Sequence, residues 1–555
     1  MKVADVVVET LEHFGVKQIF GIPGDAINNI MESVRQHENI DFIQVKHEES
    51  GAFAAGAQAK LTGKLSACVG TSGPGALHLL NGLYDAAMDG APVVAITGQV
   101  ESQYVGSDYH QEVNLESLFK DVAVYSTRVS SAEQAVSAII DACRVAQTKR
   151  GVSHITISSD IAGQTAKFDS SRLPSIMTGE ELAPSDDAVD QLKQWIGESR
   201  KTALLVGRGC KDARSEVITF AEQIRAPIVR TLPAKDIIDE TEALCVGGTG
   251  LLGDKAGVAA IDKCDLLIML GTDFPYADFY PEHATIVQID TKAHRLGRRH
   301  DISLGVQADV KAFIKRVSDN LEPHSDAEKF CRDILAIKAK ELEKKRRDEE
   351  EKSQPLSPKY VMNQVARTAD SDSVFVVDTG TIDVWAARHL PVQNQQRFTL
   401  SSNLGSMAYS LPGAIGAQLS YPNKQVYALT GDGGFAMLMP DLITAVRYEL
   451  PIIVVIFNNQ KLGFIELEQN AEGNPKSGTS ITNPNFAAIA ESCGASGYSV
   501  STSDELHQIL STLTTTNKPV VIDVRVNPDE LVMPPKIPVK DAINFGVAKI
   551  KEFMS

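Results

Sequence analysis

The sequence has no hydrophobic run that approaches the roughly 20 residues a membrane-spanning helix needs. Its first residues also lack the charged, apolar and cleavage regions of a signal peptide. The last sixteen positions, 540–555, could form a short helix, which is too short for a firm membrane anchor and leaves room only for a weak amphipathic contact. We therefore expect a cytoplasmic protein.

Basic residues are in deficit, with 54 Lys and Arg against 71 Asp and Glu and a formal net charge of −17. This balance argues against non-specific binding to nucleic acid or to an anionic membrane surface. The seven cysteines are scattered, and none forms a C-x-x-C pair. We expect reduced structural thiols instead of disulfides or a zinc site.

A chain of 555 residues has room for about three domains. Short apolar runs rich in β-branched residues alternate with helical stretches, which is typical of buried parallel strands. The clearest strand candidates are 93–97, 202–206, 266–270, 374–377, 425–429 and 452–457. The pattern predicts an α/β protein with three doubly wound parallel-sheet domains.

Two segments are predicted as the boundaries between these domains. Residues 171–187 are polar and contain proline, which is typical of a linker. Residues 327–359 carry a highly charged helix that runs into P-L-S-P-K, and we interpret its charges as a solvated face. The predicted domains are 1–172, 173–350 and 351–555.

The strongest local signal is a strand, a turn Gly431-Asp432-Gly433-Gly434, a helix and a second strand that ends at Asn459. Asp432 and Asn459 would both follow the carboxyl ends of parallel strands, where open α/β sheets bind ligands. Their oxygens suit Mg²⁺, and the glycines leave backbone N–H groups free for phosphate. The turn alone could be a tight glycine turn with a capping aspartate, but the asparagine at this spacing favours a magnesium-diphosphate site.

This G-D-G turn with its later N-N pair resembles the motif of thiamine-diphosphate-dependent enzymes. The resemblance implies that Asp432, Asn459 and the backbone carbonyl of Lys461 bind Mg²⁺. It also implies that Met407 props the cofactor in a bent conformation, although a lone methionine is usually a core residue. The implied thiamine diphosphate contacts are Gly380, Thr381, Gly405, Ser406, Met407, Asp432, Gly433 and Gly434.

The first third resembles the pyrimidine-binding domain of the same family, and Glu48 matches its activating glutamate. A carboxylic acid beside the aminopyrimidine promotes removal of the C2 proton. The alanine-rich run after Glu48 predicts that its helix is buried. The turn at 70–75 could bind an anion or simply need unusual backbone angles, and we expect His78 to be a packed helix residue.

A segment of the first third, residues 110–112, differs from the sequence usual in the family. Relatives read F-Q-E where this chain reads His110-Gln111-Glu112. Gln111 is therefore an implied catalytic residue, and His110 either faces the reacting carbon or reflects a change in packing.

The middle third resembles the FAD-binding region of pyruvate oxidases, including pyruvate:quinone oxidoreductases. The motif at 248–253 fits G-x-G-x-x-G, but no clear strand leads into it, so we do not interpret it alone as a dinucleotide fingerprint. The alternative is a domain that keeps the fold without flavin. The implied FAD contacts are Thr249, Gly250, Leu251, Leu252, Thr272, Asp273, Phe274, Pro275, Tyr276 and Asp290.

The segment at 461–469 implies the reaction within this family. Phe464 and Glu468 match the active-site phenylalanine and glutamate of pyruvate oxidases, whereas acetolactate synthases usually have a tryptophan here, and this chain has none. We therefore expect oxidative decarboxylation of pyruvate to acetyl phosphate, with oxygen as acceptor and H₂O₂ and CO₂ as products, or to acetate. The alternatives are pyruvate:quinone oxidoreductase, acetolactate synthase, non-oxidative decarboxylation to an aldehyde, and a non-catalytic paralogue that binds nucleotide.

The resemblance also predicts quaternary structure. It implies a homodimer or homotetramer in which Glu48 of one chain meets Asp432 of another.

Overall fold

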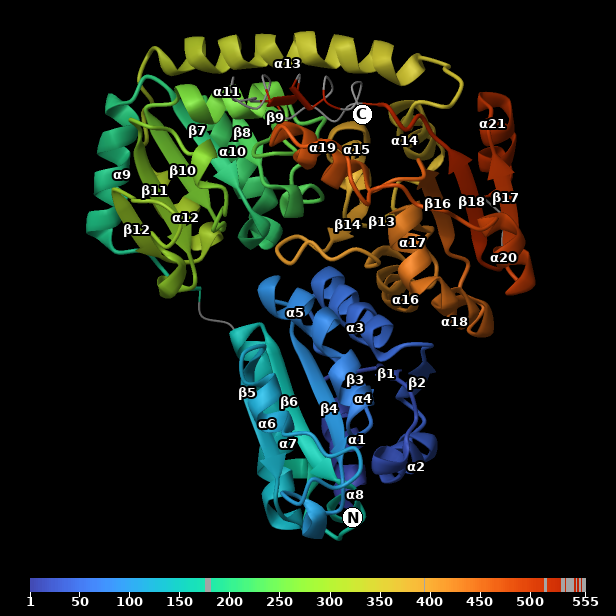
Figure 1. The fold of residues 1–555 in the computed structure, drawn as a ribbon. Helices are drawn as coiled ribbons and strands as arrows, with labels where there is room; N and C mark the ends of the chain where they lie inside the picture. Colours follow the sequence, from blue (N-terminus) through green and yellow to red (C-terminus); the bar gives the residue numbers. More distant parts are fainter. Residues whose placement is uncertain are drawn as a thin grey trace.

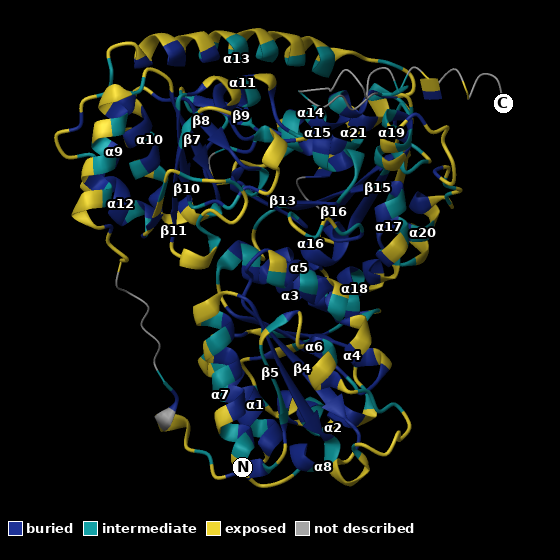
Figure 2. Cartoon of the chain, turned by 60° about the vertical axis from the view of Figure 1, so that its left-hand side comes forward, coloured by how far each residue is buried: buried dark blue, intermediate teal, exposed yellow. Residues whose placement is uncertain are grey.

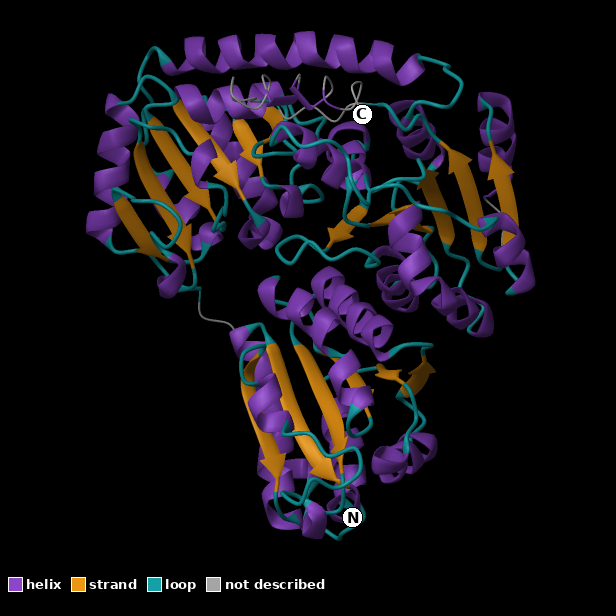
Figure 3. Ribbon diagram, viewed as in Figure 1, coloured by secondary structure: helices purple, strands orange, loops and turns teal. Residues whose placement is uncertain are grey.

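A computed structural model describes residues 1–174, 181–393, 395–513 and 517–530, together with positions 535, 544, 545, 547, 548 and 551. Three separate six-stranded parallel sheets, each covered by helices, make up the described chain (Figures 1 and 3). This confirms the prediction of three doubly wound α/β units. None of the described helices combines the length and apolar character needed to cross a bilayer.

The N-terminal sheet has the order β2-β1-β3-β4-β6-β5. Its strands are β1 Gln18–Gly21, β2 Asp41–Gln44, β3 Ser66–Gly70, β4 Val93–Gln99, β5 Ala123–Val129 and β6 Val152–Ser158. Its helices are α1 Val3–His13, α2 Asn28–Gln36, α3 Glu48–Thr62, α4 Pro74–His78, α5 Leu80–Met88, α6 Leu115–Phe119, α7 Ala132–Lys149 and α8 Ser159–Ala162. The central strands β3, β4 and β6 are buried along their whole length, which explains their continuous apolar runs.

The middle sheet has the order β12-β11-β10-β7-β8-β9, so the chain reverses direction across the sheet between β7 and β10. Its strands are β7 Thr202–Val206, β8 Ile228–Arg230, β9 Cys245–Gly248, β10 Leu266–Leu270, β11 Thr285–Asp290 and β12 Leu304–Gln307. Its helices are α9 Asp186–Glu198, α10 Arg214–Ile224, α11 Lys255–Lys263, α12 Val310–Val317 and α13 Ala327–Glu350. Such a reversal leaves a crevice at the carboxyl ends of the two strands.

The C-terminal sheet, β14-β13-β15-β16-β18-β17, repeats the strand order of the N-terminal sheet. Its strands are β13 Val374–Val377, β14 Arg397–Leu400, β15 Val426–Gly431, β16 Ile453–Asn458, β17 Ser496–Val500 and β18 Val520–Arg525. Its helices are α14 Pro358–Thr368, α15 Thr381–His389, α16 Ser410–Ser420, α17 Asp432–Leu438, α18 Leu442–Arg447, α19 Gly463–Ala471, α20 Phe486–Ser492 and α21 Ser503–Thr512. The sequence reading did not detect this shared topology.

Helix α13 spans the middle and C-terminal units (Figure 1), with exposed residues along its outer side (Figure 2). Its first half buries Phe330 and Ile334. In its second half Lys345 lies 2.6 Å from Asp254, and Glu349 accepts a hydrogen bond from His389 over 2.8 Å. The predicted solvated face is therefore present on the outer side of this half, while charges on its inner side tie the helix to both units.

Helices α3 and α16 join the N-terminal and C-terminal units through one hydrophobic core. Their backbones approach so closely that a Cβ at Gly416 would lie 2.2 Å from the carbonyl oxygen of Ala54. The small residues of α3 permit this approach, and Phe53 and Tyr409 fill the remaining space with an edge-to-face contact at 5.6 Å. The predicted burial of α3 is confirmed.

A buried lysine reinforces this junction. Lys60 Nζ lies 2.7 Å from Asp85 and 2.6 Å from Asp89, and it donates to the carbonyl of Leu400 over 3.0 Å. Its side chain is only 4% exposed, and both carboxylates are fully buried. Burial raises the pKa of Asp89, but the Lys60 and Arg208 charges outweigh this effect and bring the pKa to about 2.

We expect Lys60→Met to lower the free energy of unfolding by about 3–5 kcal/mol, because it removes the ammonium group that pairs with two buried carboxylates. Calorimetry and urea unfolding would measure the loss. Lys64→Met, at an exposed position just after the same helix, is the matched control. Equal unfolding temperatures for the two variants would contradict the prediction.

Candidate functional site

The carboxyl edge of the C-terminal sheet carries the predicted metal residues. β15 and β16 are adjacent and parallel, so Asp432 and Asn459 follow neighbouring strand ends, as the sequence predicted. Asp432 is 2% exposed, and its Oδ2 accepts hydrogen bonds from the Gln460 N–H at 2.9 Å and the Asn483 amide at 2.5 Å. Asn459 Oδ1 accepts from the backbone N–H of Lys461.

The charge balance at this edge fits a divalent cation. Burial raises the pKa of Asp432, and only neutral donors, chiefly the Asn483 amide and the Gln460 N–H, oppose that rise. The Lys461 ammonium is engaged elsewhere, with Glu466 at 3.2 Å and Asp529 at 3.7 Å. The Oδ1 of Asn483 is buried without a hydrogen-bond partner. A hard cation with its water would satisfy such oxygens.

Asp378 holds three predicted cofactor segments together. One of its carboxylate oxygens accepts from Thr430 at 2.8 Å and Ser410 at 3.2 Å, and the other from the N–H groups of Thr379 and Tyr409. Burial raises the pKa of Asp378 to about 6. A Cβ at Gly434 would lie 2.4 Å from its carboxylate, so this turn position must be glycine.

Two more of the predicted diphosphate residues can be placed, Met407 beside the turn and Thr381 beside Gly463. The Met407 terminal methyl lies 3.3 Å from where a Cβ of Gly433 would be. Thr381 lies beside Gly463 and begins α15, just after Gly380 at φ +129°. In the first turn of α15, Asp383 has a buried oxygen without a partner, and burial and the Asp378 charge raise its pKa to about 8. The buried oxygens of Asp383 and Asn483 that lack hydrogen-bond partners are compatible with a polar ligand.

A cavity of about 260 Å³ adjoins these residues. Its lining includes Thr381, Trp385, Asn459, Lys461, Glu466 and Phe545. Of the predicted α19 residues, Phe464 is partly buried against the C-terminal core, whereas Glu468 is exposed. Glu466, two residues earlier, is the α19 glutamate that faces the cavity. The final helix that we expected at 540–555 lies largely outside the described residues.

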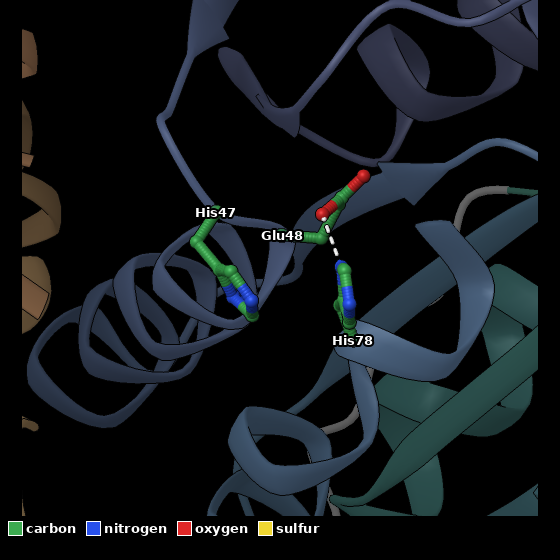
Figure 4. Close-up of side chains that lie close together, drawn as sticks. All are labelled: His47, Glu48 and His78. Atoms are coloured by element: carbon green, nitrogen blue, oxygen red, sulfur yellow. Dashed lines mark hydrogen bonds and ion pairs between the residues drawn. The ribbon is translucent and has the colours of Figure 1, made fainter. Parts of the chain in front are cut away.

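Glu48 begins α3 and is 6% exposed, as its predicted burial requires. Its Oε2 lies 2.9 Å from His78 Nδ1, and the His47 ring stacks on His78 at 4.3 Å (Figure 4). The prediction that His78 is a packed residue is wrong: its side chain is 44% exposed, because the short helix α4 ends there.

His110 and Gln111, in the segment that differs from the family, differ in how far they are exposed. Gln111 accepts a hydrogen bond from Ser72 in the turn at 70–75, next to Glu48, whereas His110 is exposed. A Cβ at Gly75 would lie 3.1 Å from Glu48 Oε1 and 2.8 Å from the Thr71 methyl, which explains the glycine in that turn.

Within one chain, a polar contact links the start of α3 to the predicted thiazolium segment at Ser406. The Asn81 amide donates to Glu49 Oε1 over 2.6 Å and to Ser406 Oγ over 2.9 Å. Glu49 neighbours Glu48 on α3, and Ser406 neighbours Met407. Asn81 thus joins the start of α3 to the loop that precedes α16.

The predicted flavin residues gather at the carboxyl edge of the middle sheet. Gly250, at φ +85°, packs against Phe274 and Tyr276, and Thr249 has a buried hydroxyl without a partner. Thr272 follows β10 and Asp290 ends β11, while the Asp273 carboxylate pairs with Arg298 and Arg299. The reading that no strand leads into 248–253 is wrong, because β9 does. Its C-V-G-G sequence is too short and glycine-rich to stand out.

The sequence reading also missed residues at the reversal point of the middle sheet. Gly207-Arg208-Gly209 follows β7, and a Cβ at Gly207 or Gly209 would lie within 2.6 Å of Gly271 or Thr272 atoms at the end of β10. The sequence feature that could have revealed these residues is a glycine pair directly after a buried strand. Asn483 was also missed; it lies 51 residues after Asp432, and only the fold brings them together.

Comparisons with known proteins agree with this geometry. Models of the thiamine pyrophosphate enzyme N-terminal binding domain, central domain and C-terminal binding domain match residues 1–118, 189–317 and 378–524. The chain is 41% identical to the Bacillus subtilis (strain 168) protein YdaP over 98% of this chain and 95% of the relative; its description goes no further than containing thiamine pyrophosphate.

Two further relatives have named reactions. Pyruvate oxidase of Lactiplantibacillus plantarum is 30% identical over 99% of this chain and 92% of its own. The large subunit of acetolactate synthase isozyme 2 of Escherichia coli (strain K12) is also 30% identical, over 96% and 97%. With its three matching domain models and these near full-length relatives, the chain belongs to the family of thiamine-pyrophosphate-dependent enzymes that includes pyruvate oxidase and acetolactate synthase.

Proposed function

We propose that this protein catalyses the oxidative decarboxylation of pyruvate with thiamine diphosphate, Mg²⁺ and FAD. Pyruvate loses CO₂, and its remaining two-carbon unit is oxidised by two electrons and transferred to phosphate or water, giving acetyl phosphate or acetate. Oxygen takes up the electrons and becomes H₂O₂. Thiamine diphosphate supplies the electron sink for decarboxylation, and FAD supplies the two-electron acceptor.

The protein's own groups have distinct roles in this proposal. Residues 1–172 contribute Glu48, which exchanges a proton with the aminopyrimidine, and Gln111. Residues 351–555 contribute Asp432, Asn459 and the carbonyl of Lys461 as Mg²⁺ ligands, and Met407 as the steric prop. Residues 173–350 hold the flavin, and Phe464 lies between the two cofactors. The enzyme acts as a homodimer or homotetramer.

The observation that supports a flavin near the thiamine site, in an oxidase or a synthase, is the docking of the predicted flavin segment onto helix α15. Arg388 of α15 donates to the carbonyl oxygens of Leu252 and Leu251. Leu252 and Phe464 pack against the same hydrophobic cluster of the C-terminal unit. Arg388 lies two turns after Thr381 on α15, so a flavin at Leu251 and Leu252 would lie about 10 Å along this helix from the predicted thiamine contact.

Acetolactate synthase is the second candidate, because relatives of both kinds are equally similar to this chain. The chain's two tryptophans are Trp195 and Trp385, so α19 lacks the tryptophan that the resemblance assigns to synthases. This absence favours the oxidase.

Anaerobic addition of pyruvate to the protein loaded with FAD, thiamine diphosphate and Mg²⁺ should bleach the flavin absorbance within one turnover. Readmitted oxygen should restore it, and parallel assays with and without phosphate would identify acetyl phosphate or acetate. Restoration by a quinone but not by oxygen would indicate the quinone-reducing alternative. Pyruvate consumption with persistently oxidised flavin and acetolactate as product would overturn the oxidase proposal.

A further inference from the structure

We propose that His78 carries protons between solvent and the buried carboxyl group of Glu48. This inference rests on the proposed role of Glu48 as the cofactor's proton donor and acceptor. It deepens that role by naming the route through which Glu48 recovers its proton.

The first support is the contrast in exposure across one hydrogen bond. The Glu48 side chain is 8% exposed, whereas the His78 side chain, 2.9 Å away, is 44% exposed (Figure 4). A carboxyl oxygen and an imidazole nitrogen at this distance share one proton, which resides on either atom. In the single chain, the pair therefore joins a buried carboxyl group to an exposed imidazole.

The second support is that no other described side chain is placed to exchange a proton with the Glu48 carboxyl group. Among the described residues, His78 is the only side chain hydrogen-bonded to the Glu48 carboxyl. Of the elements around α4, β4 carries no ionisable side chain and β3 only the buried Cys68, while Asp85 of α5 is paired with Lys60. On α3, Glu49 accepts from Asn81.

His47, which precedes α3, holds the His78 ring in place. Its Nδ1 accepts the Glu49 N–H, which fixes its orientation, and its ring stacks on His78 with an interplanar angle of 28°. The ligand atoms of His47, Glu48 and His78 lie within 4.8 Å of one another. Because the two rings are nearly parallel, their in-plane lone pairs do not converge, and we assign the cluster to proton transfer and not to a metal.

Imidazole suits this task because its two nitrogens can accept and release different protons. When Glu48 gives up a proton at Oε1, His78 Nδ1–H passes its proton to Oε2, and Nε2 takes one from water. The reverse sequence returns the proton to solvent. The number of protons on the pair is thus restored without water entering the buried site.

Hydrogen–deuterium exchange at C2 of bound thiamine diphosphate, without pyruvate, tests this route. We expect His78→Ala to slow exchange by about 100-fold, at the lower end of general acid–base contributions. Added imidazole should restore much of the rate, since the vacated position opens to solvent. His78→Asn, whose amide can still donate to Glu48 but cannot relay a proton, should remain slow.

Two results would overturn the inference. One is a wild-type exchange rate in His78→Ala. The other is a slow His78→Ala that imidazole does not rescue, which would leave His78 with at most a positioning role. Fluorescence of Trp385, in a Trp195→Phe background, would verify that each variant still binds the cofactor.

Glu48→Gln in the same exchange assay separates this inference from the proposed function. If Glu48→Gln exchanges at the wild-type rate, the role of Glu48 itself fails. If it is slow while His78→Ala is normal, only the relay fails.

Discussion

Replacement of Glu48 by glutamine should slow C2 exchange and pyruvate turnover by about 10²–10⁴-fold, the range of general acid–base catalysis. Glutamine keeps the size and polarity of the side chain but cannot exchange a proton with the aminopyrimidine. Since Glu48 lies at the start of α3 and away from the Asp432 edge, affinity for Mg²⁺ and the diphosphate should remain within a few-fold. Quenched-flow exchange and Trp385 titration would measure the two effects separately.

Glu116→Gln is a suitable control, because Glu116 is an exposed residue of α6 in the same unit, paired only loosely with Arg128 at 3.7 Å. It should match the wild type in both assays. Retention of full turnover in Glu48→Gln, with thiamine diphosphate bound, would remove Glu48 from the mechanism. Loss of cofactor binding in parallel with turnover would instead make Glu48 a binding residue.

Asp432→Asn should weaken Mg²⁺-dependent binding of thiamine diphosphate by about 140- to 4,000-fold, corresponding to the roughly 3–5 kcal/mol lost when one partner of a buried ion pair is removed. The substitution keeps an oxygen in place and removes only the charge. Trp385 lines the cavity beside Asn459 and Lys461, so its fluorescence should report binding directly. Titration of Mg²⁺ at fixed thiamine diphosphate, in the Trp195→Phe background, gives the affinity.

Asp441→Asn provides the matched control. Asp441 is another buried acid of the same segment, but it accepts from the Lys46 N–H and Thr444 and not from the Asp432 edge. This variant should leave the Mg²⁺ affinity unchanged. Burial disfavours the charge of both carboxylates, so in the absence of metal neither Asp441→Asn nor Asp432→Asn should be less stable than the wild type. An unchanged Mg²⁺ affinity in Asp432→Asn would exclude Asp432 as a ligand.

Much of the fold follows from local pattern. The predicted strands 202–206, 266–270 and 374–377 coincide with β7, β10 and β13. Strands buried on both faces need continuous apolar runs, and such runs are visible in a single sequence. Strand β9 was not predicted, because an edge strand of four residues with two glycines has no continuous apolar run.

The neighbouring positions of the two predicted metal ligands could be predicted for a related reason. Asp432 and Asn459 follow consecutive strands of one βαβ unit, and the usual pairing of such strands brings their carboxyl ends together. The roles of Phe464, Glu468 and the flavin segment came instead from resemblance. Exposure in the fold distinguishes Glu466, which faces the cavity, from Glu468, which does not.

Local sequence patterns were sufficient to predict the α/β class, the parallel strands, the burial of α3 and the neighbouring positions of Asp432 and Asn459, because each depends on residues within one strand–helix–strand segment. Contacts between distant segments could be seen only in the folded chain. His78 reaches Glu48 across 30 residues, and Asn81 reaches Ser406 across 325. These contacts depend on how α3 packs against α4, α5 and the loop before α16, and that packing is set by the summed shapes of many side chains, which no local pattern contains.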